Sequence, residues 1–205
     1  MAFSFLASNS QRITTSAPIN TLPLSIACWF RSTTISAATL PIIQIGFNTG
    51  SYWRLVIPSN TRVLRANQSG FPADTAADTI ITNQWMHGGA VFTSSASRTV
   101  YLSGTSPVTS VTSAPTPTGV TSMQIGSLET SAYWNGDIAE VGIWNTSLTA
   151  AEFTSLQQGC SCALVRPQSL VFYAPLMRDL IDIRRGLTLT NNNGALVSTH
   201  PRIYL

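Results

Sequence analysis

The chain has 205 residues, a length that suits a single β-sandwich domain. Hydrophobic residues make up 44% of it, enough to form a sizeable core. Only 9% of the residues are charged, where about 25% is usual. The formal net charge is +3, and Arg184-Arg185 is the only adjacent basic pair. Nucleic-acid binding requires a clustered basic face with stacking aromatic residues, which the sequence lacks. It also lacks an apolar run near the ~18 residues of a membrane span.

The beginning of the sequence shows neither a basic segment nor an apolar run of signal-peptide length. We therefore expect a protein made without a signal peptide. Three cysteines are present, Cys28, Cys160 and Cys162, and an odd number does not fit a disulfide framework. Because no histidine lies near the Cys-x-Cys pair, a zinc site is not supported either.

Strand patterns dominate the chain and recur roughly every ten residues between Gly, Pro, Asn and Ser, a spacing typical of sandwiches. In the first, Leu24, Ile26, Cys28 and Phe30 share one face. The predicted strands are residues 22–30, 41–47, 52–57, 62–66, 79–82, 85–93, 99–102, 122–126 and 137–144. A Ser/Thr/Pro-rich segment, residues 103–121, is expected to form a surface loop with one short strand near 108–111.

One helix is predicted over residues 150–158. Thr149 and Glu152 have the spacing of a capping box, and Leu148 with Phe153 has that of a hydrophobic staple. Gly159 is a typical residue for the position just after the last turn of a helix, so we expect the helix to end there. The fold class is therefore all-β, an antiparallel two-sheet jelly-roll sandwich with one short helix.

Three segments in this order carry a family resemblance. They are residues 24–30, with Trp29; residues 83–104, with Trp85, His87 and Gly104; and residues 123–159, with Trp144. Together they resemble the laminin G-like, pentraxin-like branch of the concanavalin A-like lectin/glucanase superfamily, of the kind found in bacteriophage structural proteins. The resemblance covers residues 22–159 and implies that Trp29, Trp85 and Trp144 occupy core positions.

The C-terminal segment resembles the strands that usually open such domains, through residues 170–176 and 186–197. Here these strands come last. We therefore expect a single domain over residues 1–205, circularly permuted, in which strands from residues 165–205 complete the sheets.

Catalysis is not expected. Glycoside hydrolysis needs two carboxylates about 5–9.5 Å apart, and the sequence has only three glutamates, Glu129, Glu140 and Glu152. Asp137 and Glu140 are three positions apart on one strand, so we expect them on opposite faces. His87 is expected to be a half-buried structural residue.

No metal or other cofactor is predicted. Calcium is the common ligand implied by the resemblance, but Ala139 stands where many relatives carry an acid before the glutamate. Asp74 with Asp78, or Asp179 with Asp182, could contribute to a calcium site, but solvated loop acids are the expected reading of both pairs.

Glycan or partner contact is assigned to the aromatic residues predicted at strand ends or in loops, Tyr52, Trp53, Tyr133 and Trp134, because sugars stack on exposed rings. The predicted function is a non-enzymatic structural protein of a bacteriophage virion: a capsid decoration, fibre or tail-associated module. Its partners would be other virion proteins, further copies of itself and surface glycans. The alternative is a free carbohydrate-binding module or lectin.

Overall fold

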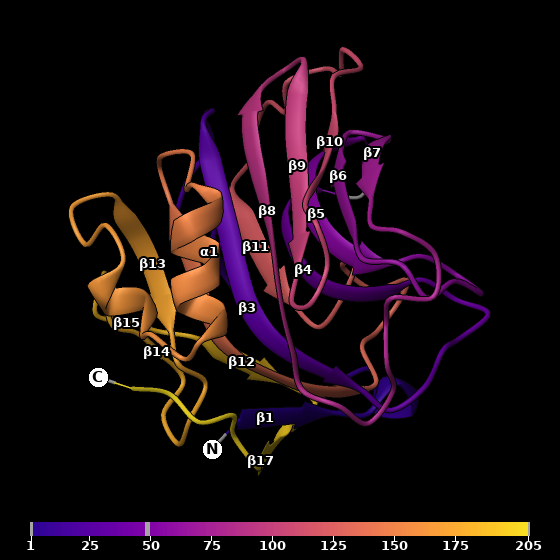
Figure 1. Cartoon of the computed structure of the whole chain (residues 1–205). Coiled ribbons are helices and arrows are strands. Elements are labelled where there is room, and N and C mark those ends of the chain that lie inside the picture. Colours follow the sequence, from indigo (N-terminus) through magenta and orange to yellow (C-terminus); the bar gives the residue numbers. More distant parts are fainter. Residues whose placement is uncertain (1, 48–49, 205) are drawn as a thin grey trace.

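The computed structural model describes residues 2–47 and 50–204. Two antiparallel sheets pack face to face, and one α-helix lies against the outer face of one of them (Figure 1). The all-β sandwich with a single helix is therefore confirmed. No helix within the described ranges is long and apolar enough to cross a membrane.

Sheet A runs in the order β10-β9-β8-β3-β12-β1-β17, with β13 also paired to β12. Its strands are β1 (Ala2–Phe5), β3 (Leu24–Ser32), β8 (Met86–Ser94), β9 (Ser97–Leu102), β10 (Val108–Ser110), β12 (Gly136–Trp144), β13 (Leu170–Ala174) and β17 (Leu196–Ser198). Sheet B runs in the order β16-β2-β11-β4-β5-β6-β7. Its strands are β2 (Arg12–Ser16), β4 (Leu40–Phe47), β5 (Ser51–Ile57), β6 (Arg65–Gln68), β7 (Phe71–Asp74), β11 (Ser122–Ile125) and β16 (Thr190–Asn192).

The core follows the alternation of apolar residues along the strands. In β3, Leu24, Ile26, Cys28 and Phe30 all point between the sheets, as the period of two predicts. The partner sheet contributes Trp53, Leu55 and Ile57 from β5.

Helix α1 (Ala150–Gln157) begins as the sequence indicates. The Thr149 hydroxyl accepts a hydrogen bond from the Glu152 N–H at 3.3 Å, and the Thr149 N–H donates to Glu152 Oε2 at 2.7 Å. Phe153 and Leu156 are buried with Leu148 in a second apolar cluster on the outer face of sheet A. The contact is close because Gly89 lies beneath the helix, where an added Cβ would be 2.3 Å from the Phe153 ring.

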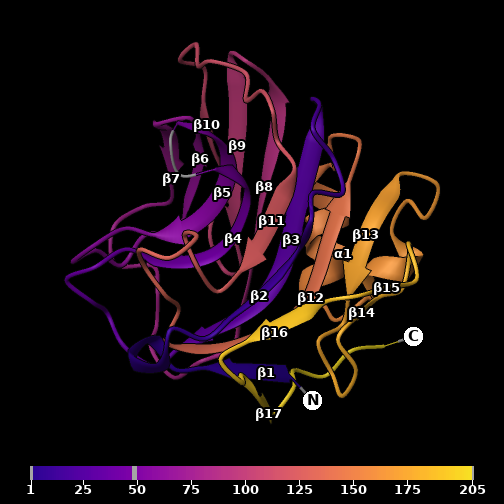
Figure 2. The ribbon, with the colours of Figure 1, turned by 180° about the vertical axis from the view of Figure 1, so that it is seen from behind.

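The C-terminal strands enter both sheets. β13 pairs with β12 and β17 with β1 in sheet A, while β16 pairs with β2 in sheet B. In Figure 2 the yellow strand β16 crosses beside β2, far from it in sequence. A short pair, β14 (Ile181–Asp182) and β15 (Leu187–Thr188), forms a separate hairpin. Whether the order of strands is permuted relative to other family members stays a prediction.

Two of the predicted strands were wrong in existence or position, and three observed strands were not predicted. Residues 79–82 form no strand, and the segment predicted at 62–66 pairs instead at 65–68. The strands β1, β2 and β7 were not predicted. β2 has one apolar residue among hydroxyls, and β7 contains Pro72, so neither shows the alternation on which the predictions depended.

The described residues also form two short 3₁₀ helices, η1 (Ala7–Asn9) and η2 (Cys162–Leu164).

Candidate functional site

Three of the four aromatic candidates are core or covered residues, so their predicted exposure was wrong. Trp53 and Trp134 are 0% exposed, and Tyr52 is 5% exposed. Buried rings cannot stack on a sugar or contact a partner.

Each of the three is buried for an identifiable reason. Trp53 shares the inward face of β5 with Leu55 and Ile57. Trp134 packs edge-to-face on Phe30, with ring centroids 6.0 Å apart. Tyr52 faces outward, but the Arg54 guanidinium lies 3.9 Å over its ring and donates a hydrogen bond to its hydroxyl at 2.9 Å.

The fourth candidate, Tyr133, lines a cleft of about 440 Å³ at one end of the sandwich. The cleft lies between three segments that are distant in sequence: η1, the β3–β4 loop and the turn before β12. Tyr133 is half-buried, and its hydroxyl has no hydrogen-bond partner among the described residues. The ring and its hydroxyl are therefore available to a ligand.

Hydrogen bonds hold two walls of the cleft together. The Thr33 N–H donates to the Asn135 carbonyl at 3.1 Å, and the Asn135 amide donates to Thr33 Oγ1 at 3.0 Å. The Trp134 N–H donates to the Gly126 carbonyl at 2.8 Å, which folds residues 126–134 into a compact turn. The buried Trp134 thus fixes the position of its neighbour Tyr133.

The polar groups of the cleft are neutral. Hydroxyl and amide side chains surround the tyrosine, and none of the lining residues carries a charge. These polar lining residues are Ser8, Thr34, Ser36, Ser131 and Asn135. Except for Tyr133, sequence reasoning missed them, because isolated Ser, Thr and Asn residues in loops give no distinctive signal.

The acidic residues named from the sequence lie elsewhere and have partners. Asp137 forms an ion pair with Arg31 at 2.6 Å. Glu140 accepts a hydrogen bond from the Tyr173 hydroxyl at 2.6 Å and lies 3.1 Å from His200 Nε2. Glu140 sits at φ +54° where β12 shifts register, so the simple alternation expected between it and Asp137 does not apply.

The acidic residues considered as calcium ligands do not gather into one site. Asp74 pairs with Arg65 at 2.6 Å, and buried Asp182 pairs with Arg185. Asp78 and Asp179 lie in loops. Within the described ranges no group of three or more metal-ligating side chains gathers.

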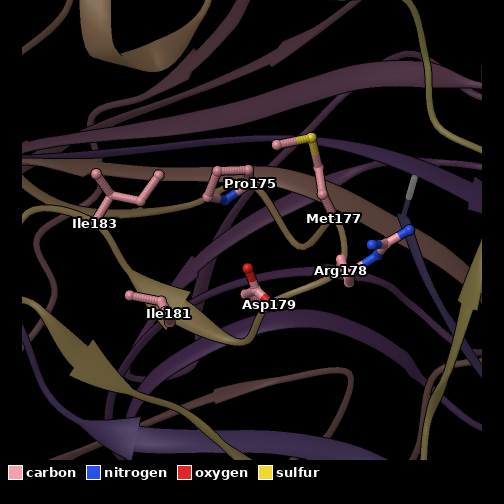
Figure 3. Close-up of a pocket in the computed structure, with 6 residues that line it drawn as sticks. All are labelled: Pro175, Met177, Arg178, Asp179, Ile181 and Ile183. Atoms are coloured by element: carbon pink, nitrogen blue, oxygen red, sulfur yellow. The ribbon is translucent and has the colours of Figure 1, made fainter.

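An apolar pocket of about 280 Å³ lies in the segment between β13 and β14. Figure 3 shows Pro175, Met177 and Ile183 on one side, with Ile181 and Asp179 opposite. Arg178 extends away from the centre in the same view. The walls of this pocket are mainly aliphatic and lack the hydroxyl and amide side chains that line the Tyr133 cleft.

A smaller hollow of about 80 Å³ lies between α1 and sheet A, with His87 in its wall. His87 is 4% exposed, buried rather than half-buried as predicted. Its ring lies edge-on to half-buried Trp29 at 5.4 Å. Trp29 and Trp85 are only half-buried and belong to neither apolar cluster, whereas Trp144 is 0% exposed in the second cluster, beneath α1.

Burial lowers the pKa of His87 to about 3. The unfolded chain therefore takes up a proton near pH 6.5 that the folded protein does not, so stability falls as the pH drops from 6.5 towards 3. We expect this one group to make unfolding about 2 kcal/mol easier at pH 5 than at pH 7.5.

Urea denaturation of the native protein and of His87→Phe at both pH values measures this effect. The only other histidine, His200, is present in both proteins and cancels. Equal pH dependence of the two proteins would contradict the burial of a neutral imidazole.

The comparisons with known proteins agree with this architecture. A protein of Bacteroides ovatus, described as a proposed carbohydrate-binding protein, has a TM-score of 0.71 at 17% identity, covering 99% of this chain. This chain spans 61% of that protein's length. A heptameric SAP-like pentraxin from Limulus polyphemus has a TM-score of 0.62 at 14% identity, covering 100% of this chain and 97% of the pentraxin.

The CBM40 of the Ruminococcus gnavus IT-sialidase, bound to α2,3 sialyllactose, has a TM-score of 0.56 at 12% identity, covering 76% of this chain and 95% of that domain. At these identities the structural likenesses show the fold alone. No curated protein matches the sequence. The family model described as the concanavalin A-like lectin/glucanases superfamily matches residues 7–153. The chain therefore belongs to the concanavalin A-like lectin/glucanase superfamily, as its motifs indicated.

Proposed function

We propose that the protein is a non-catalytic carbohydrate-binding module that takes a neutral saccharide in the Tyr133 cleft. The observation that carries the proposal is the cleft itself: a half-buried tyrosine whose hydroxyl has no partner in the described part of the chain, surrounded by uncharged hydroxyl and amide groups. Aromatic surface beside a few polar groups is the usual composition of a small-ligand site. The carbohydrate-binding proteins among its structural neighbours support a saccharide as the ligand, and the lining of the cleft is what favours a neutral one.

The absence of charge among the lining residues points to neutral sugars. A sialylated or phosphorylated glycan would bring a charge into a site that offers no basic side chain. We therefore expect hexoses and their oligomers to bind, and acidic glycans to bind no better than their neutral counterparts.

A glycan array followed by titration calorimetry tests the proposal. We expect Tyr133→Ala to weaken binding of the best neutral glycan at least about tenfold, a loss of ~1.4 kcal/mol, because stacking and the hydroxyl contact are both removed. Tyr133→Phe should retain the stacking part.

Tyr204→Ala is the matched control, since Tyr204 is 54% exposed and does not line the cleft. It should bind like the native protein. An array without a neutral ligand, or a Tyr133→Ala protein with unchanged affinity, contradicts the proposal.

A role in a virion, as a capsid decoration, fibre or tail-associated module, remains a second proposal. The observation that favours assembly is strand β17 at the end of sheet A, where Leu196 is 68% and Val197 47% exposed. Exposed apolar edge strands promote association with other chains. We expect self-association in analytical ultracentrifugation that Leu196→Lys reduces, together with recovery in purified particles. A protein that stays monomeric and is absent from particles contradicts this role.

A further inference from the structure

The hollow beneath α1 contains a buried histidine, His87, whose side chain forms no hydrogen bond with the residues that the structure describes. The contacts of the His87 ring are with two aromatic rings, Trp29 at 5.4 Å and Phe153 at 6.4 Å between centroids. Among the described residues no group donates to or accepts from its nitrogens. The ring lines the hollow, so its nitrogens can pair there with a water molecule or with a polar group of a ligand.

The hollow is open enough to admit such a partner. Its volume of about 80 Å³ adjoins His87, the β9–β10 turn and one side of α1. That is room for about two or three water-sized groups, which is too little for a pyranose ring. A single short polar arm of a larger molecule fits.

The surrounding groups define the chemistry of that arm. Ser103 and Thr105 lie on the sheet side, and Thr154 and Gln157 lie on the helix side. Ser103 Oγ accepts a hydrogen bond from the backbone N–H of His87 at 3.2 Å, which leaves the hydroxyl proton for a ligand. None of the lining residues is an acid, an arginine or a lysine, so nothing there would neutralise a charged ligand.

A hydroxyl group suits this environment best. A neutral imidazole has one donor and one acceptor nitrogen, and a hydroxyl can pair with either. The stacked rings of Tyr101 and Phe153, with centroids 4.0 Å apart, add apolar surface against which a CH₂ group can pack.

We infer that the hollow between α1 and sheet A is a second saccharide site, in which His87 and Ser103 bind the hydroxymethyl arm of a neutral sugar. The site shares its ligand class with the proposed function but uses different residues on a different part of the sandwich. A protein with both sites is bivalent and can bridge two glycan chains.

Nitrogen-15 NMR of the His87 ring in the full chain tests the inference, with His200 as an internal reference. The probes are methyl α-D-glucopyranoside, methyl β-D-galactopyranoside and their 6-deoxy analogues. We expect at least one of the two glycosides to shift the His87 ring resonances in a saturable way, while its 6-deoxy analogue does not.

Thr154→Leu provides the second variant, because this exposed helical residue can be enlarged without disturbing the core. It should close the mouth of the hollow and weaken the response at least about tenfold. Tyr133→Ala should leave the His87 response unchanged, so failure of the cleft and failure of this site are distinguishable. His87 resonances that no probe moves, that the 6-deoxy sugars move equally, or that Thr154→Leu leaves fully responsive overturn the inference.

Discussion

Replacing Trp134 by alanine is expected to destabilise the protein by about 3–5 kcal/mol, the usual cost of removing a large ring from a packed interior. Trp134 is 0% exposed and packs edge-to-face on Phe30. The substitution leaves a cavity between the sheets and loosens the turn that positions Tyr133. A loss of this size is a large fraction of the stability of a typical domain.

Urea denaturation monitored by circular dichroism measures this loss. Trp134→Phe is the matched control, since it keeps an aromatic ring and removes an indole N–H that has no hydrogen-bond partner among the described residues. It should cost much less than the alanine variant. If Trp134→Ala unfolded at nearly the native urea concentration, the residue would be a surface group and the fold at this end of the sandwich would be wrong.

The second large effect is expected at Asp182, whose removal should cost about 3–5 kcal/mol because it leaves two backbone N–H groups and the half-buried Arg185 without their acceptor. The Asp182 carboxylate accepts the Tyr173 N–H at 3.0 Å and the Arg184 N–H at 3.1 Å, and it pairs with Arg185. Arg185 in turn donates to the Ser16 carbonyl at 3.3 Å. This network joins the C-terminal segment to sheet B.

Equilibrium unfolding of Asp182→Ala, Asp182→Asn and Asp179→Ala separates the contributions. Asparagine can still accept from the two backbone N–H groups, so its loss should be intermediate. Asp179 is exposed in the same segment and should matter little. Equal stability of Asp182→Ala and Asp179→Ala would show that the network does not hold the C-terminal segment.

The helix and strands that were predicted most accurately are those with strong local sequence patterns. Helix α1 has its capping box and apolar face in a short stretch, so its limits were predicted within one residue. The alternation in β3 likewise predicted which side chains enter the core. By contrast, β1 and β2 were not predicted, because their place in the sheets depends on pairing with β12 and β11, which no local pattern reveals.

The burial of the aromatic residues could be predicted from the sequence only in part. Trp53 alternates with Leu55 and Ile57, so the period of two already indicated an inward ring, and its assignment to a surface site was avoidable. Trp134 has no such pattern. Its burial depends on the turn of residues 126–134 folding back over Phe30, a tertiary contact.

The Tyr133 cleft could not be predicted from the sequence, because its walls come from segments near residues 7, 36 and 133, which are far apart in the chain. One lining residue, Tyr133, was named because aromatic residues are rare enough to stand out. The hydroxyl groups around it belong to a chain rich in serine and threonine, in which no single one is distinctive.

Amide NMR mapping of a neutral-sugar titration tests whether the Tyr133 cleft binds a saccharide. With glucose, galactose, mannose and N-acetylglucosamine added in turn to the labelled full chain, we expect saturable shifts for at least one sugar, centred on residues 7–8, 34–38 and 131–135. Tyr133→Ala should abolish this set of shifts. Shifts confined to another surface, such as the Tyr52–Arg54 face of sheet B, or no shifts with any sugar, would contradict it.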